Sequence, residues 1–344
     1  MTTELENMWQ QEDLLKRSFD EYTGCIKAVL KEADGILQSP PHTPAEFEVR
    51  LAAIPDQTYE IRRNLFSTLF QSVYHLLKIK TSRRLLYGKL NHLFRIWVTS
   101  ADNLLDNEDK VVVPIEIIGS SRVMRQVISI MLADRILNAV TEQAVQTKVL
   151  SEAQASLITQ KTLQILLPSA AEEASEENGI AHRPDPDYVL NTIHRLKTGL
   201  LFHIPFLGPD HIENELDHNT LTLCKDGLMN FGIGCQILDD IRDLAKDYLE
   251  ARHNYILSQM YADNPVSVEK LNTIGPEIDG SSNIFHLFPD VVCPAAEKAM
   301  NLLTSGLLSL GSAGLGINKA AAVLLSLSMF ETLGVGELIT CLSL

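Results

Sequence analysis

Two clusters of aspartates are the residues of this 344-residue chain that could most readily do chemistry. Residues 102–106 read Asp-Asn-Leu-Leu-Asp, and residues 239–243 read Asp-Asp-Ile-Arg-Asp. Positions i, i+3 and i+4 share one face of a helix, so each cluster would present its carboxylates to one side. Crowded carboxylates repel one another unless a cation lies between them. Mg²⁺ suits such a place, because it takes one or two carboxylates and completes its shell with water and substrate phosphate oxygens.

The first cluster is expected near the C-terminal end of a long helix. Carboxylates at that end oppose the helix dipole, which is easier to understand if a cation binds Asp102 and Asp106. A solvated acidic helix end is the alternative. A calcium loop is a poor alternative, because the turn glycine and spaced ligands of an EF-hand are missing.

The second cluster belongs to a longer polar stripe on an otherwise apolar helix. The stripe consists of Gln236, Asp239, Asp240, Asp243 and Asp247. Adjacent aspartates on a core-facing helix indicate a metal. If the two clusters face each other, they could hold a diphosphate between them through several Mg²⁺ ions.

Composition excludes some functions. The formal net charge of -15 argues against a nucleic-acid or anionic-membrane surface, where Lys and Arg would dominate. The five cysteines show no C-x-x-C pair, which predicts reduced, mostly buried thiols in a cytoplasmic protein. The acidic, polar start is unlike a secretory signal. The uncharged run 299–318 carries too many polar residues and glycines for a transmembrane helix.

Apolar periodicity predicts an all-α protein. Helices are expected over residues 8–37, 46–80, 83–109, 118–148, 150–167, 187–203, 219–260, 290–310 and 318–340. Residues 111–114, Val-Val-Val-Pro, look like a connector. Breaks are expected at 39–44, in an acidic loop 171–186 and near 262–283. None separates compositionally distinct halves, so we expect one large helical bundle over residues 1–344, with 1–45 as an N-terminal helical extension and linker.

Three motifs together resemble a known family. The pattern G-x-x-x-Q-x-x-D-D-x-x-D at residues 232–243 resembles the second aspartate-rich motif of trans-prenyltransferases, and residues 102–106 resemble their first. His-Arg-Leu-Lys-Thr-Gly at 194–199 is similar to the segment between them. The order and spacing are similar to those of the class I isoprenoid synthase superfamily over residues 60–255.

The resemblance implies a fold and a metal site. The fold would be an all-α bundle around a central apolar cavity. At its mouth, three Mg²⁺ ions would hold the diphosphate of an allylic isoprenoid. Asp102 and Asp106 would bind metal from one wall, and Asp239 and Asp243 from the other, with Asp240 as a weaker candidate.

The resemblance also implies substrate-binding residues. Lys197 would contact the diphosphate, and the Thr198-Gly199 step would let backbone carbonyls approach a carbocation. A lysine that merely ends a helix is the alternative for Lys197. Gln236 and Arg252 are further candidates for substrate binding.

Aromatic residues before the first motif could line the pocket. Phe94 and Trp97 precede Asp102 by eight and five positions. Aromatic faces stabilise carbocations through the ring quadrupole. Ordinary core packing is the alternative for both residues.

Departures from the family pattern favour one reaction over another. Chain elongation needs a second diphosphate site, which in the family uses a G-K-x-x-R segment and an Arg-Arg pair after the first motif. Here the latter position reads Lys110-Val111-Val112-Val113, and Asn103 replaces a usual aspartate. These departures predict a terpene synthase that ionises and rearranges one allylic diphosphate. A polyprenyl diphosphate synthase and a non-catalytic subunit remain alternatives, and the resemblance implies a homodimer.

Overall fold

The computed structural model describes residues 13–38 and 42–343. The expected start of the first helix at residues 8–12 and the prolines at 40–41 lie outside these ranges. Contacts between Cα atoms divide the described chain into two compact units. The first unit holds residues 13–162 and 204–216, and the second holds residues 163–203 and 217–343.

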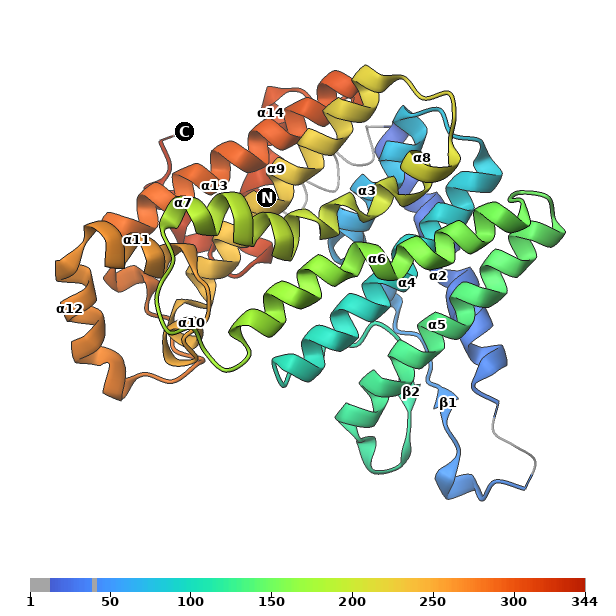
Figure 1. The fold of residues 1–344 in the computed structure, drawn as a ribbon, viewed down its shortest axis with the longest axis horizontal. Helices are drawn as coiled ribbons and strands as arrows, with labels where there is room; N and C mark the ends of the chain where they lie inside the picture. Colours follow the sequence, from blue (N-terminus) through green and yellow to red (C-terminus); the bar gives the residue numbers. More distant parts are fainter. Residues whose placement is uncertain (1–12, 39–41, 344) are drawn as a thin grey trace. The chain divides into compact units, whose positions relative to one another are not determined.

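The first unit is helical with one short β-ladder (Figure 1). Its α-helices are α2 (Asp13–Ile36), α3 (Leu65–Leu76), α4 (Thr81–Leu105), α5 (Arg122–Gln146), α8 (Leu207–Ile212) and the first part of α6 (Glu152–Glu176). Its 3₁₀ segments are Ala45–Phe47, Asp56–Tyr59, Ile61–Asn64 and Ile118–Ser120. Strands β1 (Arg50–Leu51) and β2 (Ile115–Glu116) pair antiparallel.

Helix α2 is part of the core of the first unit. Its buried residues Leu15, Tyr22, Ile26, Val29 and Ala33 follow a spacing of three, four or seven, which places them on one face. This face packs against α3 and α4, and α4 packs in turn against α5. The packing fixes α4, whose last turn carries the first aspartate cluster.

The second unit contains the remaining elements. Its α-helices are α7 (Pro186–Tyr188), α9 (His218–Arg242), α10 (Leu244–Leu249), α11 (Tyr255–Asp263), α12 (Pro265–Ile274), α13 (Pro289–Leu310), α14 (Lys319–Thr332) and the last part of α6. Residues Val189–Ile193, Arg195–Gly199 and Gly311–Leu315 form π-helical turns, and Gly275–Glu277, Phe285–Leu287 and Gly336–Cys341 form 3₁₀ turns. The 3₁₀ segment Leu201–Phe206 crosses from one unit to the other.

Helices α9 and α13 run side by side with their backbones nearly in contact (Figure 1). A Cβ atom placed on Gly306 would lie 2.5 Å from the carbonyl oxygen of Gly227, and one on Gly227 would lie 2.9 Å from that of Gly306. Two turns further along α9, a Cβ atom on Gly234 would lie 3.1 Å from the carbonyl oxygen of Ala299. Glycine is therefore required where the two helices cross. This contact sets the position of α9, which carries the second aspartate cluster.

The all-α class predicted from the sequence is confirmed, and most expected helices are present. The prediction of a helix over 46–80 is wrong for the first half of this range, which contains Pro55 and short 3₁₀ turns. The helix expected over 219–260 is three helices, with breaks at Asp243 and 250–254. The break expected near 262–283 contains α12.

The prediction of an acidic loop over 171–186 is also wrong for the first part of this range. Helix α6 continues through Pro168 to Glu176. The glutamates of this segment therefore lie on a helix, where Glu172 and Glu176 share a face one turn apart.

The expectation of five reduced thiols is wrong for one pair. The C-terminal turn Gly336–Cys341 packs on α13 and brings Cys341 to Cys293, 48 positions earlier, where the two form a disulfide. The other three cysteines, Cys25, Cys224 and Cys235, are free and buried, as predicted. None of the helices among the described residues combines the length and the hydrophobicity of a membrane span.

A buried histidine in the first unit gives a pH test of this core. Burial lowers the pKa of His92 to about 3, and its ring Nδ1 lies 3.0 Å from the Tyr22 hydroxyl. The folded state therefore binds fewer protons than the unfolded state between pH 6.5 and 3, so stability falls as the pH decreases through this range. We expect this residue alone to lower the free energy of unfolding by about 2 kcal/mol between pH 7 and pH 5.

Urea denaturation at several pH values measures the effect. The His92→Gln variant should be less stable at pH 7 but lose less stability on acidification. His211→Gln, which changes an exposed histidine of the same unit, should keep the wild-type slope. Equal slopes for His92→Gln and wild type would contradict the assignment of a neutral His92.

Candidate functional site

The first aspartate cluster lies in the last turn of α4. Asp106 is the C-cap of the helix, and its backbone N–H donates to the carbonyl of Asp102 at 2.8 Å. The Asp102 side chain is 45% exposed and accepts from Lys110 Nζ at 3.3 Å. Lys110 also contacts Glu108 at 2.5 Å. The carboxylates of Asp102 and Asp106 are therefore partly open to solvent, with a lysine beside the first.

Asn103 faces the protein interior. It is 2% exposed, and its side chain donates to the Lys110 carbonyl at 2.8 Å and accepts from the Lys110 N–H at 3.0 Å. This paired contact closes the turn 103–110. The Glu108 N–H also donates to the Asn103 carbonyl at 3.0 Å, with Asn107 in the left-handed conformation at φ 59°, which is a Schellman ending.

Arginines of α5 hold the same turn. Arg122 donates to the carbonyl of Asn107 at 2.6 Å, and Arg125 pairs with Asp109 at 2.9 Å. The turn that follows the first motif is thus tied to α5 by two basic side chains. Its conformation is fixed by the protein before any ligand binds.

The second aspartate cluster ends α9 in the same way. Asp243 is the C-cap, and its N–H donates to the Asp239 carbonyl at 2.8 Å. The guanidinium of Arg242 bridges the two carboxylates, at 2.5 Å from Asp239 and 2.6 Å from Asp243. Burial raises the pKa of Asp239 to about 6, and the nearby Asp243 and Asp240 add to the rise while Arg242 opposes it. The Asp239 side chain keeps 38% exposure, so water and cations reach it.

Asp240 is buried, at 3% exposure, among protein donors. It accepts hydrogen bonds from His194 Nε2 at 2.9 Å, from the Tyr255 N–H at 2.6 Å and from Gln236 Nε2 at 2.9 Å. Burial by itself would raise its pKa, but His194 and these donors lower it below the ordinary value. The carboxylate is therefore ionised and bound within the protein.

Asn254 joins the second cluster to the next helix. Its side-chain oxygen caps α11 by accepting from the N–H groups of Ile256 and Leu257. Its side-chain nitrogen donates to the Asp240 carbonyl at 2.7 Å and to Asp247 at 2.8 Å. Burial and the charge of Asp240 raise the pKa of Asp247 well above its usual range.

The segment 194–199 packs beside α9. Thr198 donates a hydrogen bond to the side-chain oxygen of Gln236, and Gly199 leaves room for the sulfur of Met229. Lys197, Thr198 and Gly199 lie in a π-helical turn, a rare conformation that is frequent at functional sites.

Lys197 and Arg252 are paired with glutamates of α6. Lys197 Nζ lies 2.7 Å from Glu176 and 3.1 Å from Glu173. Burial disfavours the charged lysine, but Glu176 and Glu173 outweigh it and raise its pKa. Arg252 lies 3.7 Å from each of the same two glutamates and 3.2 Å from Glu250. In this structure the two predicted diphosphate ligands thus neutralise buried carboxylates.

The glutamate cluster on α6 was not predicted from the sequence. Glu172, Glu173 and Glu176 lie in the segment expected to be a loop, and His253 lies between α10 and α11. The spacing of Glu172 and Glu176 by four was the available signal, but Pro168 and the polar composition concealed the helix.

The predicted aromatic residues pack together. Phe94 is 1% exposed, and its ring meets Trp97 edge-on at 5.6 Å between centroids. The Trp97 N–H donates to the Ile130 carbonyl at 3.2 Å. Both rings therefore join α4 to the core of the first unit.

The pairing of Asn103 predicts the outcome of restoring the usual aspartate. In Asn103→Asp, a carboxylate would face the Lys110 carbonyl without a donor, which should lower the free energy of unfolding by about 1–3 kcal/mol. We also expect no gain in Mg²⁺ affinity, measured by titration calorimetry, because position 103 faces inward. Asn138→Asp, at an exposed position of α5, is the matched control. An unchanged unfolding midpoint, or tighter Mg²⁺ binding, would contradict this account.

Comparison with known proteins places the fold. No protein-family model matches the sequence, and no characterised protein matches it in a sequence search. Solved structures do match. A decaprenyl diphosphate synthase from Rhodobacter capsulatus aligns with a TM-score of 0.61 at 14% identity, over 94% of this chain and 99% of that one.

Two further structures agree. A geranylgeranyl pyrophosphate synthetase from Pyrococcus horikoshii Ot3 aligns with a TM-score of 0.58 at 15% identity, over 94% of this chain and 99% of that one. A polyprenyl synthase from Caulobacter crescentus CB15, complexed with calcium and isoprenyl diphosphate, gives a TM-score of 0.57 at 14% identity, over 92% of this chain and 97% of that one. The predicted resemblance is therefore confirmed at the level of fold: this chain shares the all-α fold of these prenyl synthases.

Proposed function

We propose that the protein is an Mg²⁺-dependent enzyme that releases diphosphate from an allylic isoprenoid diphosphate and joins the resulting cation to the double bond of isopentenyl diphosphate. The new cation then loses a proton to give the longer prenyl diphosphate. The arrangement at the two helix ends is the observation that carries the proposal. In each motif the first and last aspartates are partly open, while the second residue points inward. The prenyl synthases of the same fold support chain elongation as the leading reaction, in place of the cyclisation favoured by the sequence.

The donor set fits Mg²⁺. The open positions offer only carboxylate oxygens, which this hard cation prefers. Lys110 already pairs with Asp102, and Arg242 already pairs with Asp239 and Asp243. We infer that Asp102, Asp106, Asp239 and Asp243 are the metal ligands and that Mg²⁺ bound there would neutralise the charge of the departing diphosphate.

The protein side chains would have separate tasks. Asp240 positions the second motif through His194 and Tyr255, and its own oxygens are occupied. Arg242 would turn from the carboxylates toward the diphosphate when metal binds. Lys197 and Arg252 would have to release Glu173 and Glu176 before they could contact the diphosphate. Thr198 and Gln236 would fix the turn that carries Lys197.

A terpene synthase is the second candidate. The absence of an arginine pair after the first motif favours it, because elongation needs a site for the second diphosphate. In this position the chain has Lys110 followed by valines, and the arginines of α5 are engaged with Asn107 and Asp109.

Incubation with allylic diphosphates, with and without isopentenyl diphosphate, separates the candidates. We expect longer prenyl diphosphates that form only with isopentenyl diphosphate and only with Mg²⁺, detected by mass spectrometry. Hydrocarbon or alcohol formed from the allylic substrate alone would identify the terpene synthase instead. If neither product nor Mg²⁺-dependent pyrophosphate release occurs with any chain length, both proposals fail and a non-catalytic subunit is favoured.

Substitutions test the two motifs. Asp102→Ala and Asp239→Ala should each lower the rate by about 10²-fold or more, because each removes a ligand of the charge-stabilising metal. Asp226→Ala removes an exposed carboxylate from the same helix as Asp239 and should leave the rate unchanged. Unchanged rates in both motif variants would overturn the assignment.

The double variant tests whether both motifs act on one substrate. If they act as a unit, Asp102→Ala/Asp239→Ala should be no slower than the slower single variant. Multiplied losses would show that the motifs contribute independently, which contradicts a shared diphosphate.

A further inference from the structure

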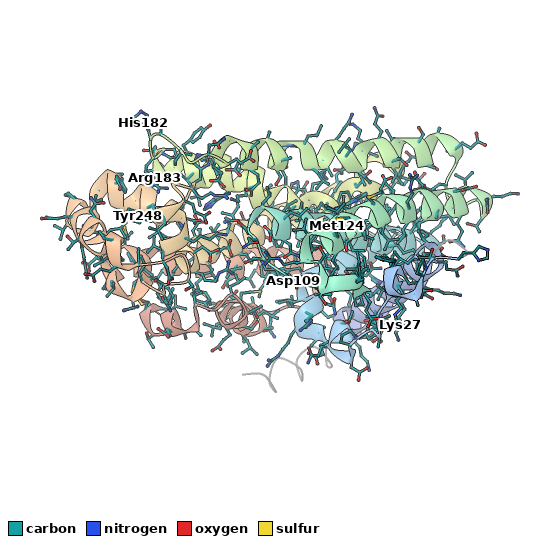
Figure 2. All side chains as sticks on the ribbon, turned by 90° about the horizontal axis from the view of Figure 1, so that it is seen from below. Lys27, Asp109, Met124, His182, Arg183 and Tyr248 are labelled. Carbon is teal, nitrogen blue, oxygen red and sulfur yellow. A yellow bond between two sulfur atoms is a disulfide. The ribbon has the colours of Figure 1, made fainter. Side chains whose placement is uncertain are left out.

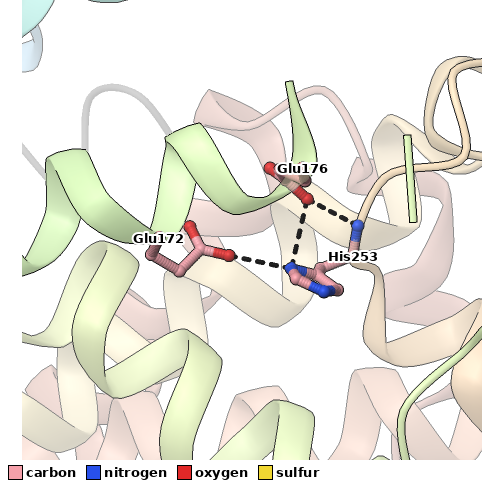
Figure 3. Close-up of side chains that lie close together, drawn as sticks. All are labelled: Glu172, Glu176 and His253. Carbon is pink, nitrogen blue, oxygen red and sulfur yellow. Dashed lines mark hydrogen bonds and ion pairs between the residues drawn. The ribbon is translucent and has the colours of Figure 1, made fainter. Parts of the chain in front are cut away.

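A second group of metal-ligating side chains lies apart from the aspartates. Glu172 and Glu176 project from the last two turns of α6 toward His253, in the turn between α10 and α11 (Figure 3). Their side chains are 3%, 0% and 14% exposed. All three belong to the second unit.

The ligand atoms have the separations of a coordination shell. His253 Nδ1 lies 2.9 Å from Glu172 Oε1 and 3.4 Å from Glu176 Oε2, and one atom of each residue lies within 4.8 Å of the others. With metal–ligand bonds of about 2.1 Å, neighbouring ligand atoms are roughly 3.0–3.4 Å apart. The two imidazole–carboxylate distances fall at or just below this spacing, so His253 can share one ion with each glutamate.

The group is also fixed by the backbone. The His253 N–H donates to Glu176 Oε2 at 2.6 Å, while Lys197 binds the other oxygen, Glu176 Oε1. The turn is anchored further by Arg183, which donates to the carbonyls of Arg252 and Asp247. The histidine and the helix are therefore held in position by contacts other than their own hydrogen bond.

One oxygen of the group lacks a partner. Within residues 13–38 and 42–343, Glu172 Oε2 is buried without a hydrogen-bond donor, and Glu172 as a whole is only 6% exposed. A buried acceptor left in this state costs about 1–3 kcal/mol. An ion pair with His253 does not remove this cost, because the single N–H of His253 Nδ1 reaches only Glu172 Oε1 and leaves Oε2 without a donor. A cation bound by both oxygens of Glu172 would remove it.

We propose that Glu172, Glu176 and His253 form a binding site for a divalent transition-metal ion, Zn²⁺ by preference. The imidazole nitrogen selects Zn²⁺ over Mg²⁺, which prefers oxygen ligands. The ion takes the place of the proton on His253 Nδ1, and water completes its shell. It ties the end of α6 to the turn that follows the second aspartate motif, and thus has a structural role.

Metal binding in excess Mg²⁺ tests the site. Metal-free protein is dialysed against about 10 µM Zn²⁺ with a large excess of Mg²⁺, and bound zinc is measured by mass spectrometry. We expect about one Zn²⁺ per chain, an increase in the melting temperature, and a visible absorption band when Co²⁺ is used as the probe.

Matched variants assign the ligands. Glu172→Gln and His253→Gln should each weaken Zn²⁺ binding at least tenfold and lose the thermal shift. His182→Gln, which changes an exposed histidine (Figure 2), should bind as wild type. Asp239→Asn should also retain zinc, which separates this site from the aspartate motifs.

Two results would overturn the inference. One is wild-type protein that retains well under one Zn²⁺ per chain in this dialysis, a result that holds even if a variant fails to fold. The other is undiminished zinc binding by folded His253→Gln. Neither result bears on the proposed reaction, which depends on Mg²⁺ at the aspartates.

Discussion

Carboxylates gathered at the C-terminal ends of two helices are the constraint on which the rest of the structure depends. Asp106 ends α4 and Asp243 ends α9, where the helix dipole already concentrates negative charge. Such a placement needs positive charge close by. The protein supplies Lys110 at one end and Arg242 at the other. Both side chains are partly exposed.

The second residue of each motif shows how the open aspartates are held. Asn103 closes the turn after α4 through Lys110, and Asp240 links α9 to His194 and to the start of α11. Asparagine suits the first site because it must both donate and accept, whereas the second site offers only donors and suits a carboxylate. The departure from the family pattern at position 103 therefore has a structural explanation. It does not by itself remove a metal ligand.

Much of this could be predicted from the sequence, because apolar periodicity and the two aspartate motifs are local signals. The helices carrying Asp102 and Asp239 and the all-α class follow from them. The partners of charged side chains could not be predicted in this way. Lys197 was expected to contact substrate, yet the glutamates beside it come from α6, about twenty residues earlier, and from a segment that Pro168 made look like a loop. The Cys293–Cys341 disulfide likewise depends on the C-terminal turn packing on α13.

The glycine crossing of α9 and α13 has a consequence for how this fold can vary. At Gly227 and Gly306 the backbones of the two helices are in direct contact, and neither glycine position has room for a Cβ atom. An added methyl group would have to be accommodated by displacing the whole of α9. The displacement would reach the carboxylates at its far end, several turns away. Residues that never meet a ligand can thus limit the geometry of the chemistry as strictly as the aspartates do.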